Sequence, residues 1–346
     1  MLVFPQMITS GTTSNHKQDF KGDETSTLTI SRPMLLLGIL VLTGLVVFVV
    51  VHVGEMERFA VLLSHAEPAW LILAVILQAG TYLCAGMIWH EVTRPRARSV
   101  PARALFRLSV EQLSVNQIIP TGGVAGNLLV FQAMRRLGLP AWLAAEAMLA
   151  EILSGYIAYA TVAIVALATL LALGGVTRGI CYVLVAFAVA AAAVVSTILY
   201  LLKHKDRQLP SWADRFNPLF AAHQAAKHVS SRRVLSWRLL ARTSALNIAI
   251  FLLDSGTLWA MMHVAGAPIG IPTTFVAIVI AFIAGTVSFL PGGIGGFETG
   301  AVTTLTLLGS SIEVALAGTL LFRGLTLWLP LVPGLMLARQ DIKIKL

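Results

Sequence analysis

The chain has 346 residues, of which 57% are hydrophobic and only 12% are charged. Soluble domains carry about 25% charged residues, so this composition excludes an ordinary soluble domain and indicates an integral membrane protein. The net charge of +9 does not indicate a nucleic acid partner, because the basic residues lie in loops between apolar segments.

Residues 1–32 are polar, rich in Thr, Ser and Asn, and lack the shape of a signal peptide. We expect them to form a disordered cytoplasmic tail, followed by an uncleaved membrane anchor. A membrane-spanning helix needs about 20 apolar residues. Six segments reach this length, at residues 33–53, 68–90, 141–172, 179–202, 239–263 and 312–338.

Two further apolar stretches are interrupted by proline and paired glycines, which break helices. The first stretch, residues 105–134, contains Pro120 and Gly122. The second, residues 273–309, contains the run Pro291-Gly-Gly-Ile-Gly-Gly-Phe-Glu298. Neither stretch offers an unbroken helix of the length that a membrane span requires.

The second interruption carries a carboxylate in a region with little other charge. Between residues 264 and 338 the only ionisable residues are Glu298, Glu313 and Arg323. A carboxylate in hydrocarbon is costly and usually serves a function. The residues of the run that we expect to contact a polar substrate or an ion are Pro291, Gly293, Gly295 and Glu298.

Lys and Arg counts give the expected orientation. Residues 91–107 contain five arginines and residues 203–242 contain nine Lys or Arg, whereas residues 54–67 have one arginine against three glutamates. Cytoplasmic loops are enriched in basic residues, so we expect both termini on the cytoplasmic side. Each interrupted stretch must then leave the membrane on the side where it entered. The sequence therefore predicts two re-entrant helical hairpins that open to opposite faces.

The two interrupted stretches resemble each other. With an offset of 171 residues, Pro120 matches Pro291 and Gly122 matches Gly293. Inverted halves built from spanning helices and broken helices are common in secondary transporters. A chance resemblance of two glycine-rich turns is the alternative.

The predicted fold class is all-α, with about six transmembrane helices and two re-entrant hairpins in an inverted repeat. One membrane domain covers residues 33–338. Its repeats cover about 33–172 and about 179–338, joined by a basic cytoplasmic segment at 203–238, and residues 339–346 form a cytoplasmic tail.

Six ionisable residues are expected at membrane depth, and they are Glu111, Glu146, Glu151, Asp254, Glu298 and Arg323. Five acids and one arginine do not neutralise each other, so some acids must be protonated, hydrated or matched by a cation. We expect Arg323 to pair with Glu298 or Glu151, or to bind an anionic head group. A purely stabilising ion pair is the alternative.

Glu298 is expected near the start of a half-helix, where a carboxylate can cap the helix and where free N–H groups can bind phosphate. Asn127 is the corresponding residue in the first hairpin and can form hydrogen bonds there without charge. Asn247 and Asp254 lie seven residues apart on one helix face. They could line a cavity, although helix–helix hydrogen bonds are the expected role.

The sequence indicates neither a metal site nor a cofactor. Cys84 and Cys181 lie in apolar segments, and the histidines lack metal-ligand spacing. The glycine run lacks the strand–turn–helix setting of a dinucleotide site. Membrane glycosyltransferases often carry an external acidic pair, and the nearest approach here is Glu55 and Glu57, which a solvated loop explains more simply.

The second half of the chain resembles the membrane domain of lysylphosphatidylglycerol synthase/flippases. The resemblance rests on Pro291-x-Gly293-x-Gly295-x-x-Glu298, Leu308-Gly309, Ala317, Leu321-Phe322-Arg323-Gly324, Pro330 and Gly334. Pro120, Gly122 and Glu151 fit the other half, and the resemblance covers most of residues 91–338. The first half is less complete, with Asn127 where a charge is expected.

The resemblance implies an inner-membrane protein of a bacterium or archaeon that moves, or helps to process, a lipid with a polar head group. Its expected partners are this lipid, anionic or glycosylated, and enzymes of lipid synthesis. The sequence ends at Leu346 without an aminoacyl-transferase domain, so lipid aminoacylation is not expected.

The function expected from these observations is lipid translocation, with Glu298, Arg323 and Glu151 contacting the head group or carrying a proton. The alternatives are a membrane glycosyltransferase or its accessory subunit, and a structural partner in a lipid-synthesis complex.

Overall fold

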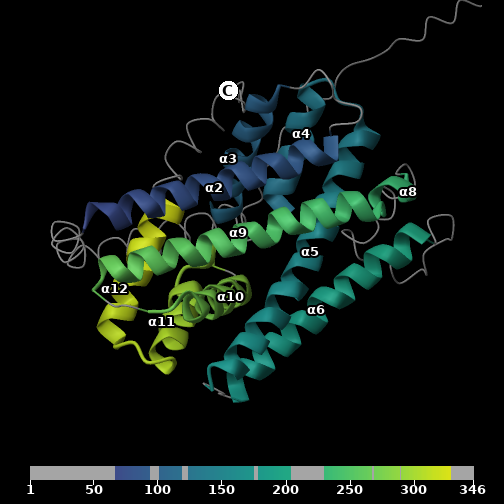
Figure 1. Ribbon diagram of the computed structural model, residues 1–346. Coiled ribbons are helices and arrows are strands. Elements are labelled where there is room, and N and C mark those ends of the chain that lie inside the picture. The colour runs from purple at the N-terminus through teal and green to yellow at the C-terminus, as the bar shows by residue number, and fades with distance from the viewer. Residues whose placement is uncertain are drawn as a thin grey trace, which may run out of the picture. The chain divides into compact units, whose positions relative to one another are not determined.

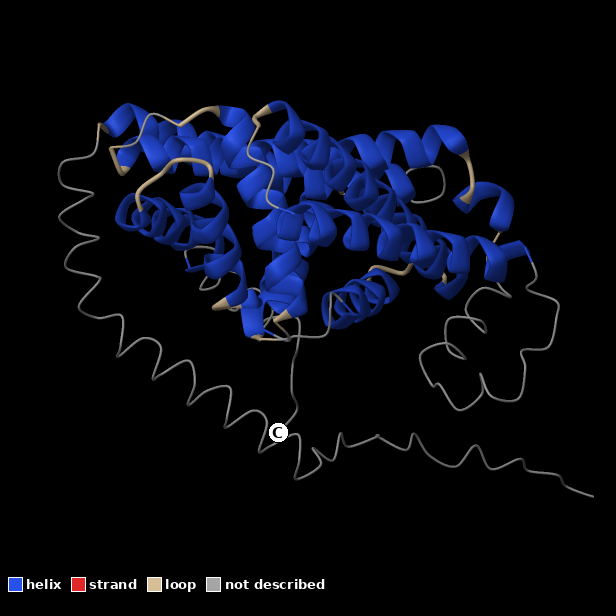
Figure 2. Cartoon of the chain, turned by 90° about the horizontal axis from the view of Figure 1, so that it is seen from below, coloured by secondary structure: helices blue, strands red, loops and turns tan. Residues whose placement is uncertain are grey.

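The computed structural model describes residues 67–93, 101–118, 124–174, 178–203, 230–266, 269–288 and 290–328. All of them belong to the compact unit His52–Leu346. Within these ranges every regular element is a helix, as Figures 1 and 2 show.

Four described helices are long and apolar enough to cross a membrane. They are α2 (Pro68–Thr93), α5 (Ala141–Ala172), α6 (Arg178–Lys203) and α9 (Trp237–Val264). The shortest of them have 26 residues, or about 39 Å, against a hydrocarbon core of roughly 30 Å. These helices confirm four of the six predicted spans. Residues 33–53 lie outside the described residues, and the last predicted span is described only as far as residue 328.

The remaining helices are shorter. They are α3 (Ala102–Ile118), α4 (Val124–Arg136), α8 (Ser231–Val234), α10 (Ile271–Val287), the 3₁₀ turn η2 (Pro291–Gly293), α11 (Gly296–Leu307), and α12 (Ile312–Arg323) with its π-helical continuation η3 (Gly324–Trp328). With 17 and 12 residues, α10 and α11 are about 26 Å and 18 Å long. The second apolar stretch is therefore divided into two short helices at the glycine run, as its sequence predicts.

Helices α10 and α11 pack closely and antiparallel because glycine lines their interface. A Cβ atom on Gly293 would lie 2.8 Å from the Cα of Gly285, and one on Gly296 would lie 2.6 Å from the backbone oxygen of Ala284. Gly293 also has a φ of 65°, which disfavours any residue with a side chain. The backbones of the two helices meet at distances that only glycine permits.

Helices α2 and α9 lie side by side and antiparallel (Figure 1). At one end Trp70 packs on His263 with ring centroids 4.4 Å apart. At the other end Arg242 forms an ion pair with Glu91, with 3.4 Å between Nη1 and Oε2. The two helices thus share a contact surface along most of their length.

The buried apolar residues form two clusters. One includes Leu258, Met262, Ile278 and Phe322 and joins α9 to α10, α11 and α12. The other contains Trp89, Leu105, Met134, Leu143 and Leu153 and joins α2 to α3, α4 and α5. The described unit is therefore held together by apolar packing around both interrupted stretches.

It stays a prediction that the interrupted stretches re-enter a membrane and that they are related as an inverted repeat. The same holds for the predicted domain boundaries, because residues 1–32, 204–229 and 339–346 lie outside the described residues.

Candidate functional site

An ion pair joins α11 to α12 beside the glycine turn. The distance between Arg323 Nε and Glu298 Oε1 is 2.7 Å, and the two side chains are 8% and 15% exposed. The predicted pairing of Arg323 with Glu298 is confirmed. Because both groups are largely removed from water, either of them without the other would be costly in this place.

Arg323 also holds the turn itself. Its Nη2 donates to the backbone oxygen of Gly292 at 2.6 Å. Its guanidinium lies 4.7 Å from the centre of the Phe297 ring, a cation–π contact. Gly292 has a φ of 63°, so the backbone turns sharply where the guanidinium contacts it. One cation therefore contacts the turn, the first turn of α11 and the carboxylate of Glu298.

Glu298 uses its second oxygen to cap α11. The N–H of Gly295, the N-cap residue with a φ of 81°, donates to Glu298 Oε2 at 2.7 Å. A carboxylate in the first turn of a helix is favourable because the helix dipole is positive there. Capping and pairing were separate alternatives from the sequence, and the structure shows both, one through each oxygen.

Arg323 has further hydrogen-bonding capacity. A guanidinium carries five N–H donors in a planar fork that matches carboxylate and phosphate groups. In the described part of the chain its hydrogen bonds go to Glu298 and Gly292. The arrangement can therefore hold a second anion, or exchange one carboxylate for a phosphate.

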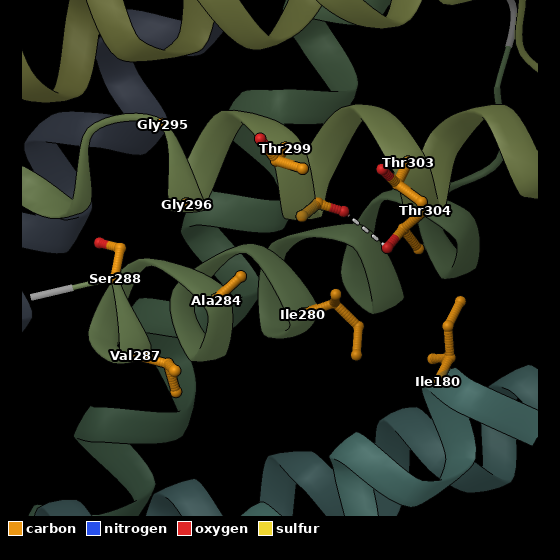
Figure 3. A pocket seen from close by; sticks show the side chains of 11 residues that line it. Ile180, Ile280, Ala284, Val287, Ser288, Gly295, Gly296, Thr299, Thr303 and Thr304 are labelled. Carbon is orange, nitrogen blue, oxygen red and sulfur yellow. Dashed lines mark hydrogen bonds between the residues drawn. The ribbon is translucent and has the colours of Figure 1, made fainter.

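An open groove of about 600 Å³ runs along the α10–α11 pair toward α6. Figure 3 shows Thr299 and Thr303 on α11 along this groove, with Ile180 of α6 across it. The two threonines are four residues apart and so lie on one helix face. Gly295 also lines the groove, so the groove begins at the turn that the ion pair holds.

The first interrupted stretch carries a neutral polar network. Trp89 Nε1 donates to Gln112 Oε1, and Gln112 Nε2 donates to Asn127 Oδ1, both at 2.8 Å. Asn127 therefore links α4 to α3 and α2 without charge. Pro120 and Gly122 lie outside the described residues.

The two interrupted stretches meet in the structure. Helix α3, the first half of one stretch, packs against η2, the turn of the other. Parts of the two stretches, which the sequence predicts to open to opposite faces, are therefore in contact.

Two of the predicted membrane-depth acids have arginine partners that were not predicted from the sequence. Glu111 pairs with Arg107 at 2.8 Å, and Glu146 lies 3.5 Å from Arg233 of α8. Arginines therefore match two of the acids that Arg323 alone could not neutralise. The i,i+4 spacing of Arg107 and Glu111 was visible in the sequence, whereas Arg233 reaches Glu146 only through the fold.

Glu151 was the other expected partner of Arg323, and none of its described contacts joins it to Arg323 or Glu298. It lies on α5, where the hydroxyl of Ser154 donates to its backbone oxygen at 3.0 Å. Asn247 of α9 donates to the Ser154 hydroxyl at 3.4 Å. Glu151 is therefore next to a contact between α5 and α9, apart from the ion pair.

Asp254 makes a helix–helix hydrogen bond, as its sequence position predicts. It is 5% exposed, and Thr81 of α2 donates to its Oδ1 at 3.2 Å. Asn247, seven residues earlier, contacts α5 instead. The polar face of α9 is therefore divided between two neighbouring helices.

Among the described residues no group of three His, Cys, Asp or Glu side chains is placed to hold a metal ion. Cys84 and Cys181 are free thiols. Glu55 and Glu57, on which the glycosyltransferase alternative depends, lie outside the described residues.

Comparison with known proteins identifies the family. A search of curated proteins found no match. Residues 35–334, however, match the family described as the lysylphosphatidylglycerol synthase TM region, which is associated with lipid modification and flippase-like membrane roles. Pro291, Glu298 and Arg323 all lie within the matched residues. The chain is therefore a multi-pass integral membrane protein and belongs to the lysylphosphatidylglycerol synthase TM region family.

Proposed function

We propose that this protein translocates a lipid with an anionic, phosphate-bearing head group across the cytoplasmic membrane, with the α10–α11 pair as part of the path. The observation that carries the proposal is the position of Arg323. Its guanidinium is buried at a broken helix, bound to one carboxylate and one backbone oxygen. An intramembrane charge in such a place marks a substrate or ion pathway in many transporters.

An arriving anion can exchange with the carboxylate of the ion pair. A phosphate can take the place of the Glu298 carboxylate on Arg323, because both anions fit the guanidinium fork. Glu298 then keeps its bond from the Gly295 N–H and the favourable field of the α11 N-terminus. In the absence of lipid, Glu298 neutralises the guanidinium. We therefore assign Arg323 as the head-group ligand and Glu298 as the anion that it exchanges.

The groove along α11 provides polar contacts next to the lipid phase. The hydroxyls of Ser288, Thr299 and Thr303 lie along its walls, while Ile180 and Ile280 supply apolar contacts. A head group passing along the α10–α11 pair can bind these hydroxyls while its acyl chains stay among apolar side chains and lipid. A lipid translocase requires such separate surroundings for the polar head group and for the acyl chains.

The first interrupted stretch completes the proposed path from the opposite face. In this proposal Pro120, Gly122 and Asn127 contact the head group without charge, and Glu151 lies along the same path. The inverted repeat, the cytoplasmic position of both termini and the location in a bacterial inner membrane belong to the same proposal. The packing of α3 against η2 supports it.

Reconstitution tests the proposal. The purified protein is placed in vesicles with a labelled phosphatidylglycerol, and transfer between leaflets is followed with a quencher that cannot cross the membrane. We expect the wild type to accelerate transfer over protein-free vesicles and Arg323→Ala to remove most of this acceleration. Glu313→Gln is the matched control, because Glu313 is exposed at the start of the same helix.

The proposal is wrong if folded, monodisperse Arg323→Ala protein transfers lipid at the wild-type rate. It is also wrong if the wild type gives no acceleration with phosphatidylglycerol, phosphatidylethanolamine or glycolipid probes. A loss of stability without a change in transfer per folded molecule would assign the pair a structural role only.

A further inference from the structure

A second buried carboxylate, that of Asp254, lies apart from the Arg323–Glu298 pair, in the contact between α2 and α9. Thr81, its partner on α2, is about 16 Å along the helix from Trp70 and about 15 Å from Glu91. Trp70 contacts His263 at one end of this helix pair, and Glu91 contacts Arg242 at the other end. Because the hydrocarbon core is roughly 30 Å thick, Asp254 lies near its middle.

Asp254 has no ion-pair partner within the described residues. The helices packed against α9 carry several ionisable side chains, whereas α10 carries none. They are Tyr82, Cys84, His90 and Glu91 on α2, Glu146, Glu151, Tyr156 and Tyr159 on α5, Arg232 and Arg233 on α8, and Glu313 and Arg323 on α12. Of these, Tyr82 has an electrostatic interaction with Asp254. Glu91 is paired with Arg242 at the end of α9. The arginines Arg233 and Arg323 are bound to Glu146 and Glu298. A carboxylate 5% exposed and without a cation is far less costly when it carries a proton.

The hydroxyl of Thr81 suits both protonation states of Asp254. It lies 3.2 Å from Asp254 Oδ1 and 3.4 Å from the backbone oxygen of Leu77. A hydroxyl has one hydrogen to donate and can accept as well. It donates to the ionised carboxylate. When Asp254 is protonated, the carboxyl O–H donates to Thr81, and Thr81 donates to Leu77. Both states are hydrogen-bonded without movement of a heavy atom.

The same face of α2 carries a further acceptor. Gln78 is three residues before Thr81 and is 7% exposed. Its side-chain oxygen has no hydrogen-bond partner among the described residues. A buried acceptor gives no stabilisation to a carboxylate anion. On α2, the Thr81 hydroxyl therefore remains the hydrogen-bond partner of Asp254 in both protonation states.

We infer that Asp254 is a proton-binding site between α2 and α9, and that proton uptake and release there drive lipid movement at the α10–α11 pair. The chemical step is the formation and breaking of one carboxyl O–H bond, with the proton taken from water on one side and released to water on the other. The coupling rests on the proposed function, whereas the proton site does not.

Infrared difference spectroscopy tests the proton site without lipid transfer. Spectra of the protein in lipid nanodiscs are recorded as the pH is lowered. We expect a carbonyl band of a protonated carboxyl group in the wild type that is absent from Asp254→Asn. Thr81→Val, which removes the hydroxyl, should shift this band, and Thr81→Ser should restore it. A wild-type spectrum identical to that of Asp254→Asn would overturn the site.

Transfer under an imposed pH gradient tests the coupling. In sealed vesicles the pH gradient should change the rate of lipid transfer by the wild type. Asp254→Asn should transfer lipid at the same rate with and without the gradient. A response to the gradient in Asp254→Asn, or a response to sodium instead of protons, would overturn the coupling. If no protein transfers lipid but the Asp254 band still titrates, the proposed function fails and the proton site stands.

Discussion

Arg323 and Glu298 lie 2.7 Å apart across the α11–α12 contact, and both also bind the backbone of the glycine turn. Arg323 donates a hydrogen bond to the backbone oxygen of Gly292, while Glu298 accepts one from the N–H of Gly295. The turn is thus fixed at two points by one neutral pair. Any ligand that separates the pair releases one of these points, which makes the turn sensitive to anions.

Replacing Arg323 by alanine should lower the free energy of unfolding. Arg323→Ala leaves the Glu298 carboxylate largely buried without its counter-charge, and we expect a loss of about 3 kcal/mol. Glu298→Gln should lower the free energy of unfolding by less than Arg323→Ala does, because an amide oxygen can still accept a hydrogen bond from the Gly295 N–H. Thermal unfolding in detergent measures both. Equal unfolding temperatures for Arg323→Ala and wild type would show that the pair contributes nothing.

The close approach of α10 and α11 should make Gly293 intolerant of a side chain. Gly293→Ala places a Cβ 2.8 Å from the Cα of Gly285, on a backbone whose φ is 65°. The left-handed conformation alone costs about 1–2 kcal/mol, and the clash adds to it. The matched control is Gly155→Ala, where a Cβ on α5 meets no atom within 4 Å. Unfolding temperatures should fall for Gly293→Ala and stay or rise for Gly155→Ala.

The position of the groove predicts that hydroxyls on only one face of α11 contribute to the rate of lipid transfer. Replacing Thr299 and Thr303 together by valine should slow lipid transfer several-fold with little effect on unfolding, because valine has nearly the same shape. Thr306→Val is the control, since Thr306 is exposed on α11 but does not line the groove. An equal effect of both changes would remove the groove from the path.

Glu146 should behave differently from Glu298, although both are buried acids of the membrane domain. Its carboxylate accepts from the Ser230 N–H at 2.9 Å and lies 3.5 Å from Arg233, so it connects α5 to the start of the α8–α9 segment. We expect Glu146→Ala to lower the unfolding temperature and to leave the transfer rate per folded molecule unchanged. A selective loss of transfer would place Glu146 on the path instead.

The sequence predicted four of the long helices and narrowed the partners of Arg323 to Glu298, Glu151 or an anionic head group. The apolar segment at residues 141–172 coincides with α5, because an unbroken apolar run has one stable conformation in a membrane. Glu298 could be named in advance as a candidate partner because few charges occur in that half of the chain. The structure selects Glu298 from these alternatives.

Contacts between distant helices could not be predicted in the same way. Glu146 is matched by Arg233 from a basic segment with many candidate cations, and the choice among them depends on how α8 folds back. The contact of Asp254 with Thr81 depends on the register of α2 against α9, which Gly80 and Gly256 set by admitting Leu253 and Leu77. Periodicity gives the face of a helix but not its register against a neighbour.

Binding of a short-chain phosphatidylglycerol to the purified protein tests most directly whether a head group replaces Glu298 on Arg323. Glu298→Gln removes the competing charge and should bind this lipid more tightly than the wild type, whereas Arg323→Ala should bind it at least tenfold more weakly, about 1.4 kcal/mol. Glu313→Gln should match the wild type. Equal affinities for the wild type, Glu298→Gln and Arg323→Ala would contradict the account.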